Sequence, residues 1–204
     1  MLKKYNLPTI ADFKLDIDLK KLQEECDKIS QKFVDVRSAN PMLCDNHMDL
    51  VKQVYDNFEQ INLTTPEEIL PYTSDIKERL KRKEEHLYKV PTSDYTNSYF
   101  ESIVKQLKSP ASRVRITKLA AGKTIPFHVD YDVSYAVRCI CPIYSSGSVV
   151  NLFKRNNTVE AYTLEEGKAY FLNIGYPHAV VNLSNKPRIA LMFSLDGQAD
   201  LENL

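Results

Sequence analysis

The sequence predicts an α+β protein in which helices precede a β-sandwich or jelly roll. All five glycines lie beyond residue 120, at positions 122, 147, 167, 175 and 197, and glycine marks the tight turns between strands. From residue 112 the apolar residues begin to alternate with a period of two, in about eight short runs. Many short strands at close spacing are typical of sandwiches and jelly rolls, and cupin-like jelly rolls are frequent hosts for a metal between two sheets.

Helical periodicity marks the first 110 residues. Apolar residues recur at intervals of three and four along 19–33 and 51–58, which predicts two helices with one buried face each. The run Thr65-Pro66-Glu67-Glu68 predicts the start of another helix, with a cap, a proline in the first position and an acidic first turn. Asp94 is expected to cap a last helix, which ends at Pro110.

The segment 75–88 is rich in charge of both signs. Glu78 and Arg82, and likewise Lys81 and Glu85, stand four residues apart and are expected to pair on a helix surface. Mixed signs indicate a solvated helical face rather than a surface for nucleic acid.

Composition argues against several classes of protein. Lysine plus arginine equals aspartate plus glutamate at 27 each, whereas proteins that neutralise phosphates usually carry a basic excess. No apolar run approaches the roughly 18 residues of a membrane span, and residues 1–8 lack the apolar core of a signal peptide. We therefore expect a cytoplasmic protein without a nucleic-acid or membrane partner.

The four cysteines are too few and too scattered for a disulfide framework, which also favours a reducing compartment. Cys139 and Cys141 share one face of an apolar run and are expected to be small buried side chains. Zinc would need two further ligands at hairpin spacing, and the sequence offers none.

Seven apolar runs with a period of two are expected as strands. They cover 113–119, 135–141, 149–153, 159–162, 169–172, 179–183 and 188–193, and turn residues separate them. The sequence contains no internal repeat and no low-complexity segment.

The most informative residues are His128, Asp130 and His178. One residue separates His128 from Asp130, so on an extended segment both side chains point the same way. His178 follows about fifty residues later, which leaves room for four or five strands and a return to the same end of the fold. Two imidazoles and one carboxylate are the ligand set of a facial non-heme Fe(II) site. A lone His-x-Asp pair is common on surfaces, and the second histidine favours the metal site.

Arg188 opens the last long apolar strand, ten residues after His178. A cation that reaches into a β core needs an anion, because a buried unpaired charge is very costly. Arginine is also suited to binding a carboxylate at two points. The alternative is an arginine at the surface end of a strand.

The spacing of these four residues resembles the Fe(II)/2-oxoglutarate-dependent dioxygenases. The residues around His128 and around His178 are similar in sequence to the aspartyl/asparaginyl β-hydroxylase-like branch of these enzymes, which includes bacterial free-proline hydroxylases. The resemblance covers roughly residues 112–196. It implies a double-stranded β-helix, that is a cupin-like jelly roll, with N-terminal and flanking helices. We expect residues 1–110 to form a mainly helical region that packs on a catalytic core of residues 111–204, within one compact domain.

The resemblance also implies roles for individual residues. His128, Asp130 and His178 would hold Fe(II), and Arg188 would bind the distal carboxylate of 2-oxoglutarate, with O2 as the second cosubstrate. Halogenases of this family lack a carboxylate at the position of Asp130, so Asp130 indicates a hydroxylase.

Further polar residues are candidates for the same cavity. Arg138 lies inside an apolar run, and the family often has an arginine near this position that contacts cosubstrate or substrate; a structural ion pair is the alternative. Arg115 and Thr117 share one strand face with Arg113, so Arg115 is a candidate for a substrate carboxylate and Thr117 for 2-oxoglutarate. Asn182 is a candidate lining residue. His47 and His86 stand in polar helical contexts and are not expected in the site.

The predicted function is hydroxylation of an unactivated C–H bond in a small substrate that bears a carboxylate, such as a free amino acid. One alternative is hydroxylation of an Asp, Asn or Pro side chain in a protein. Others are a non-catalytic jelly-roll module that binds a metal or ligand, and a cupin-type enzyme without 2-oxoglutarate. The sequence leaves the oligomeric state open.

Overall fold

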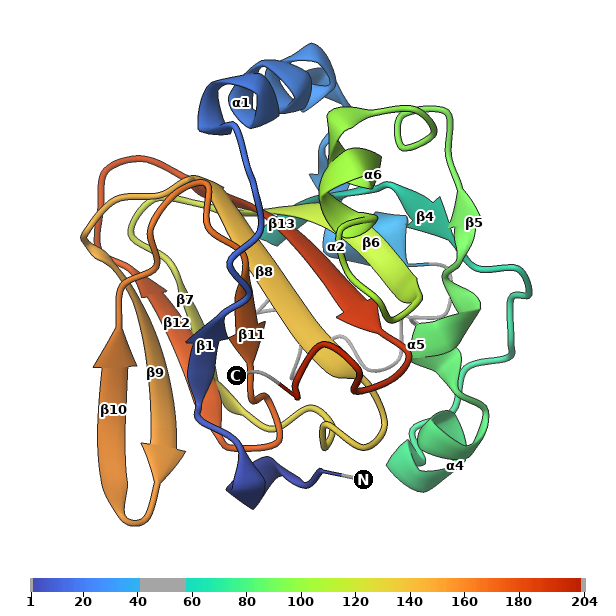
Figure 1. Ribbon diagram of the computed structural model, residues 1–204, viewed down its shortest axis with the longest axis vertical. Coiled ribbons are helices and arrows are strands. Elements are labelled where there is room, and N and C mark those ends of the chain that lie inside the picture. Colours follow the sequence, from blue (N-terminus) through green and yellow to red (C-terminus); the bar gives the residue numbers. More distant parts are fainter. Residues whose placement is uncertain (1, 41–57, 203–204) are drawn as a thin grey trace.

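Eight strands of the second half of the chain alternate between two antiparallel sheets (Figure 1). In the computed structural model, which describes residues 2–40 and 58–202, the larger sheet contains β6 (Ala111–Leu119), β8 (Val137–Tyr144), β11 (Tyr170–Leu172) and β13 (Arg188–Leu195). The smaller sheet contains β7 (Thr124–His128), β9 (Val149–Arg155), β10 (Thr158–Tyr162) and β12 (His178–Asn182). Because the chain crosses between the sheets after nearly every strand, the strands wind into a double-stranded β-helix. The predicted α+β fold with a cupin-like jelly-roll core is confirmed.

The first part of the chain extends the larger sheet at both edges. β1 (Ile10–Asp12) pairs with β11, and β3 (Phe58–Asn62) pairs with β6 and with β2 (Val34–Asp35). β4 (Thr64–Thr65) and β5 (Val90–Pro91) form a separate short ladder. Short strands thus accompany the helices of this part of the chain, and its division into a mainly helical region of residues 1–110 and a core of residues 111–204 stays a prediction.

The described helices are short and lie around the larger sheet. They are η1 (Lys4–Asn6), α1 (Leu19–Lys28), η2 (Ser30–Lys32), α2 (Val36–Ala39), α4 (Ile76–Lys81), α5 (Glu84–Leu87) and α6 (Tyr99–Val104). The spacing of apolar residues predicted α1 correctly, and this helix buries Leu22 and Cys26 behind a cap at Asp18, whose side chain accepts from the Lys21 amide. Among the described residues, no helix has the length and apolarity that crossing a bilayer requires.

Two of the predicted helix starts are wrong. No helix begins at Pro66, because Thr64–Thr65 is strand β4 and the Glu67 amide donates to the Leu87 carbonyl; the next helix, α4, is capped by Asp75. Helix α6 is capped by Ser98, since the Asp94 carboxylate instead pairs with Lys32 at 2.7 Å.

The predicted helix over 51–58 lies outside the described residues except for its end. Phe58 itself opens strand β3 instead of completing a helical face.

The larger sheet is buried on both faces, and residue parity separates them. On β8 and β13 the odd-numbered side chains, such as Cys139 and Phe193, pack in the core that includes residues of α1 and α6. The even-numbered Ile140 and Ala190 pack toward Phe153 of the smaller sheet. Charged residues at even positions on these strands therefore point between the two sheets. Cys26, Cys139 and Cys141 are buried free thiols as predicted, and Cys44 lies outside the described residues.

Candidate active site

Two strand ends of the smaller sheet bring the predicted triad together. His128 is the last residue of β7, His178 is the first residue of β12, and the two are cross-strand partners. Asp130 follows β7 by two residues, with Oδ1 at 3.6 Å from Nε2 of His128. Candidate ligand atoms of all three residues lie within 4.8 Å of one another. The sequence spacing therefore predicted a real cluster.

Backbone carbonyls orient both imidazole rings. Nδ1 of His128 lies 2.8 Å from the Pro126 carbonyl, and Nδ1 of His178 lies 3.0 Å from the Tyr176 carbonyl. A carbonyl only accepts, so each Nδ1 donates a hydrogen to its carbonyl and each Nε2 is the ring nitrogen left to face a metal. Burial, followed by the neighbouring charge of His128, lowers the pKa of His178 to about 4, so this ring is neutral at pH 7. Such outer hydrogen bonds are typical of histidines that bind metals.

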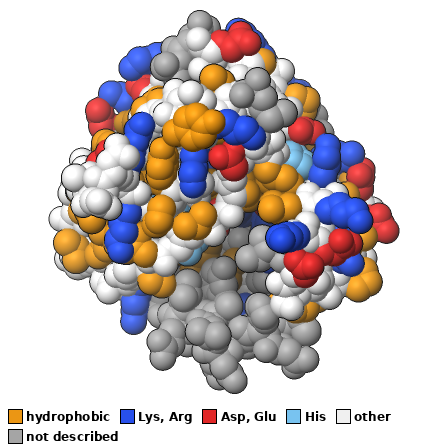
Figure 2. All heavy atoms as spheres, turned by 90° about the horizontal axis from the view of Figure 1, so that it is seen from below, with side chains coloured by type: hydrophobic (Ala, Val, Ile, Leu, Met, Phe, Trp, Pro, Cys, Tyr) orange, Lys and Arg blue, Asp and Glu red, His pale blue; other side chains and the backbone are white. Residues whose placement is uncertain are grey.

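The donor set suits Fe(II) with room for further ligands. Two imidazole nitrogens and one carboxylate match the facial arrangement of non-heme iron sites. The side chains of His128 and Asp130 are 40% and 32% exposed, so other ligands can reach the cluster from solvent. Figure 2 shows a face of the molecule that is hollowed near its centre, with basic and hydrophobic side chains gathered around the hollow.

Arg188 and Thr117 lie together on the inner face of the larger sheet. Nη1 of Arg188 donates to Thr117 Oγ1 at 3.3 Å, and both residues are buried. Burial lowers the pKa of Arg188 to about 10, so the guanidinium remains charged at neutral pH. Among residues 2–40 and 58–202 no carboxylate pairs with it, although a buried guanidinium needs an anion. The structure thus brings together the two residues predicted for 2-oxoglutarate.

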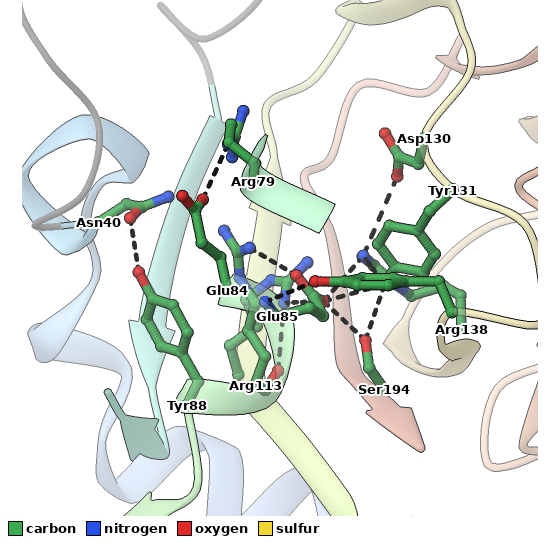
Figure 3. A network of polar contacts seen from close by, with 12 residues as sticks. Asn40, Arg79, Glu84, Glu85, Tyr88, Arg113, Asp130, Tyr131, Arg138 and Ser194 are labelled. Carbon is green, nitrogen blue, oxygen red and sulfur yellow. Dashed lines mark hydrogen bonds and ion pairs between the residues drawn. The ribbon is translucent and has the colours of Figure 1, made fainter. Parts of the chain in front are cut away.

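Three arginines approach Glu85 of α5, and Figure 3 shows two of them, Arg113 and Arg138. Nη2 of Arg138 lies 3.0 Å from Glu85 Oε1, and Nη1 of the third, Arg115, lies 4.0 Å from the same oxygen. Arg113 reaches the other oxygen, Oε2, at 2.6 Å. Arg138 therefore forms a structural ion pair with Glu85, which is the alternative to a role in binding cosubstrate or substrate. Its Nη2 also lies 4.0 Å from Oδ2 of Asp130, so Arg138 is beside the triad as well.

Glu85 is the site residue that the sequence interpretation missed. Glu85 is only 4% exposed, so the prediction that it lies on a solvated helix face and pairs with Lys81 is wrong. The other predicted pair, Glu78 with Arg82, does form, at 3.1 Å. Burial acts to raise the pKa of Glu85, but the charges of the surrounding arginines outweigh it and hold this pKa well below its ordinary range. One feature of the sequence could have indicated a buried glutamate. Several arginines stand at strand positions that face inward, and buried arginines require a buried carboxylate as partner.

Asn182 is not a lining residue of the cavity. Its amide nitrogen donates to the carbonyls of Leu119, Ala120 and Lys186, and its Oδ1 accepts from both the amide and the hydroxyl of Ser184. It is fully buried and ties the turn after β12 to the end of β6.

His86 lies outside the triad, as expected. Its Nε2 contacts the Tyr135 carbonyl at 2.9 Å. His47 lies outside the described residues.

Replacing Asn182 with alanine is expected to destabilise the protein by about 2–4 kcal/mol, because several buried hydrogen-bond partners lose their bond at once. Chemical denaturation measures this change. Asn185→Ala, an exposed position in the same turn, is the matched control and should change stability little. Equal effects of the two substitutions would contradict the structural role given to Asn182.

The fold and the site together place the chain in a class of proteins. These are cupin-like jelly rolls that carry a His-x-Asp pair and a distant histidine as candidate metal ligands. The sequence model of the Aspartyl/Asparaginyl beta-hydroxylase family matches residues 76–196, more than half of the chain. The chain belongs to the aspartyl/asparaginyl β-hydroxylase family. It is therefore a 2-oxoglutarate-dependent hydroxylase, which uses Fe(II) and O2.

Solved structures of low sequence identity are also similar to the chain. A prolyl-4-hydroxylase from Pseudomonas putida is 10% identical, with 92% of this chain and 91% of that chain covered and a TM-score of 0.49. A 2OG-Fe(II) oxygenase family oxidoreductase from Burkholderia pseudomallei is 7% identical over 85% of this chain and 88% of that chain, with a TM-score of 0.42. A cupin domain from Bordetella pertussis is 15% identical over 45% of this chain and 88% of that chain, with a TM-score of 0.34. No curated protein matches the chain.

Proposed function

We propose that this hydroxylase acts on a small substrate with its own carboxylate, such as a free amino acid. The observation that carries the proposal is a surplus of buried positive charge beside the triad. Among the described residues, these arginines (Arg113, Arg115 and Arg138) surround the carboxylate of Glu85, and only Arg138 lies near a second carboxylate, that of Asp130 at 4.0 Å. A buried cation without a partner is very costly. A carboxylate of the substrate would supply the missing anion.

His128, Asp130 and His178 would hold the iron. When bound, the iron supplies the oxidising chemistry that, with 2-oxoglutarate and O2, places a hydroxyl group on a C–H bond of the substrate. The chain's own contribution is to present two Nε2 lone pairs and one carboxylate in fixed orientation. Their exposure on one side leaves coordination positions open.

Arg188 and Thr117 would bind the distal carboxylate of 2-oxoglutarate. Arg188 Nη1 donates only to the Thr117 hydroxyl among the described residues, so most of its donors remain for a ligand. Ala190 lies opposite Thr117 on the neighbouring strand and is fully buried, as is much of the apolar layer between the sheets. A carboxylate bound here would be shielded from water, which strengthens its attraction to the guanidinium.

Arg115 is the best candidate for the substrate carboxylate. Its side chain is 9% exposed, and its Nη1 donates to the Arg113 carbonyl at 3.1 Å. Burial, with the charges of Arg138 and Arg113, lowers the pKa of Arg115 to about 9, which still leaves it protonated at neutral pH. An internal proline or asparagine of a protein has no free carboxylate to offer, which favours a free amino acid. Arg138, which points toward both Glu85 and Asp130, would assist.

The test is succinate release from the Fe(II)-loaded enzyme with a panel of free amino acids and of peptides that contain Asp, Asn or Pro. We expect a free amino acid to stimulate succinate release. Arg115→Met should then raise KM for that substrate about 10- to 100-fold, as expected for the loss of a charged hydrogen bond, with little change in KM for 2-oxoglutarate. Arg82→Met, which removes an arginine that pairs with Glu78, is the control. Turnover of peptides alone would contradict the proposal.

A further inference from the structure

We infer that Glu85 is a positioning residue that keeps Arg138 away from Asp130, so that the Asp130 carboxylate remains available to a metal. This inference rests on the proposed role of Asp130. Glu85 contacts no member of the triad, and it acts through Arg138 and Tyr131 (Figure 3).

Glu85 is held by donors from four different parts of the chain. Its Oε1 accepts from Ser194 at 2.7 Å, from Tyr131 at 3.0 Å and from Arg138 at 3.0 Å, while Oε2 accepts from Arg113 at 2.6 Å. Ser194 lies directly opposite Arg138 on the neighbouring strand. A carboxylate with this many partners in the protein interior has a fixed position and a fixed charge.

Arg138 stands between two carboxylates. Its Nη2 lies 3.0 Å from Glu85 Oε1 but 4.0 Å from Asp130 Oδ2, and it also donates to the Tyr131 hydroxyl at 2.6 Å. A buried guanidinium pairs with the nearest anion, because an unpaired charge in the interior is very costly. If Glu85 lost its charge, the long contact with Asp130 would be the ion pair left to Arg138, and shortening of that pair would occupy oxygens that a metal needs.

Helix α5 also fixes the loop that carries Asp130. The Glu85 amide donates to the Tyr135 hydroxyl at 3.1 Å, and His86 Nε2 donates to the Tyr135 carbonyl at 2.9 Å. Tyr131, next to Asp130 in the chain, binds the Glu85 carboxylate itself. One short helix therefore determines both the loop position and the partner of Arg138.

Strand β6 is distorted where it reaches Glu85. Arg113 has φ of 48°, in the left-handed region that a bulky residue rarely adopts. The pairing of β6 with β13 shifts at this position, between Met192 and Ser194, which marks a β-bulge, a device that redirects side chains near active sites. The bulge in β6 thus directs the Arg113 side chain toward Glu85.

The test is anaerobic titration of Fe(II), and separately of Co(II), into the purified protein, with the dissociation constant as the readout. Glu85→Gln should weaken metal binding about 10- to 100-fold, the usual effect of losing a partner outside the ligand shell. Glu84→Gln is the matched control, because Glu84 is buried on the same helix but pairs with Arg79 at 2.8 Å, and it should bind metal as the wild type does. The double variant Glu85→Gln/Arg138→Gln should recover most of the lost affinity, since the competing cation is gone.

The double variant separates the effect of Arg138 from other effects of the Glu85 substitution. Failure of the double variant to bind metal more tightly than Glu85→Gln, with both variants folded by circular dichroism, overturns the inference. So does a Glu85→Gln variant that binds metal as tightly as Glu84→Gln. A wild-type protein that binds neither metal would instead overturn the proposed iron site, and the inference with it.

A charge-balanced pair of variants keeps the test valid if Glu85→Gln does not fold. Glu85→Gln/Arg113→Met removes one buried cation together with the anion, and circular dichroism verifies that it folds. Metal binding by this variant should be weak, and adding Arg138→Gln should strengthen it. The absence of that gain counts against the inference in the same way.

Discussion

Replacing Arg188 with methionine is expected to raise KM for 2-oxoglutarate about 100-fold or more while Fe(II) binding stays within a few-fold of wild type. A bidentate contact between a guanidinium and a carboxylate contributes about 1.5–3 kcal/mol for each charged hydrogen bond, and each 1.4 kcal/mol or so is a factor of ten in affinity. Arg188 is 4% exposed and has no competing carboxylate among the described residues. Steady-state succinate release measures KM, and anaerobic titration measures iron binding.

Arg188→Lys is the matched control for this prediction. It keeps the positive charge but offers a single point of contact, so its KM should fall between those of the wild type and Arg188→Met. Equal losses of iron binding and 2-oxoglutarate binding in Arg188→Met would mean that Arg188 supports the fold of the site rather than the cosubstrate.

Replacing Asp130 with alanine is expected to abolish tight Fe(II) binding and turnover. Asp130 supplies the only anionic oxygen of the described triad, so its removal deletes both a ligand and the charge that offsets the metal. Arg138, 4.0 Å away, would then be the nearest charge to the site and would repel a cation further. Anaerobic titration with Fe(II) and succinate release in air measure the two effects.

Asp132→Ala is the control for Asp130→Ala. Asp132 lies in the same loop, but its carboxylate accepts from the Ser134 amide at 3.0 Å and is not part of the triad. It should bind Fe(II) normally. Iron binding that survives in Asp130→Ala, or that is lost equally in Asp132→Ala, would contradict the ligand role of Asp130.

Prediction from the sequence succeeded where a pattern is local. Alternation with a period of two located β6, β8, β9, β10, β11, β12 and β13, because each half-buried or buried strand repeats its environment every second residue. The same rule placed His128 and Asp130 on one side of the chain. Prediction failed at the start of a helix after Thr65, where pairing of β4 with β5 overrides a capping sequence.

The environment of Glu85 shows why the rest of the site was out of reach. A glutamate four residues after a lysine is typical of a solvated helix face, and nothing within α5 distinguishes it from such a residue. Its partners, Arg113, Arg138 and Ser194, are 28, 53 and 109 residues away in the chain. Asn182 is similar in part, because two of its hydrogen bonds go to carbonyls at the end of β6, 63 and 62 residues away in the chain.

The sequence alone therefore predicted the jelly-roll core, the two histidines and the aspartate of the candidate iron site, and an arginine that needs an anion in the core. These follow from the spacing of residues and the chemistry of each side chain, whereas the role of Arg188 toward 2-oxoglutarate is implied by the resemblance to the dioxygenases. The tertiary structure decided which buried charges face one another, and so revealed the carboxylate that holds Arg138 beside Asp130. The physical reason is that the energy of a buried charge depends on its distance to partners from remote parts of the chain, which no local pattern records.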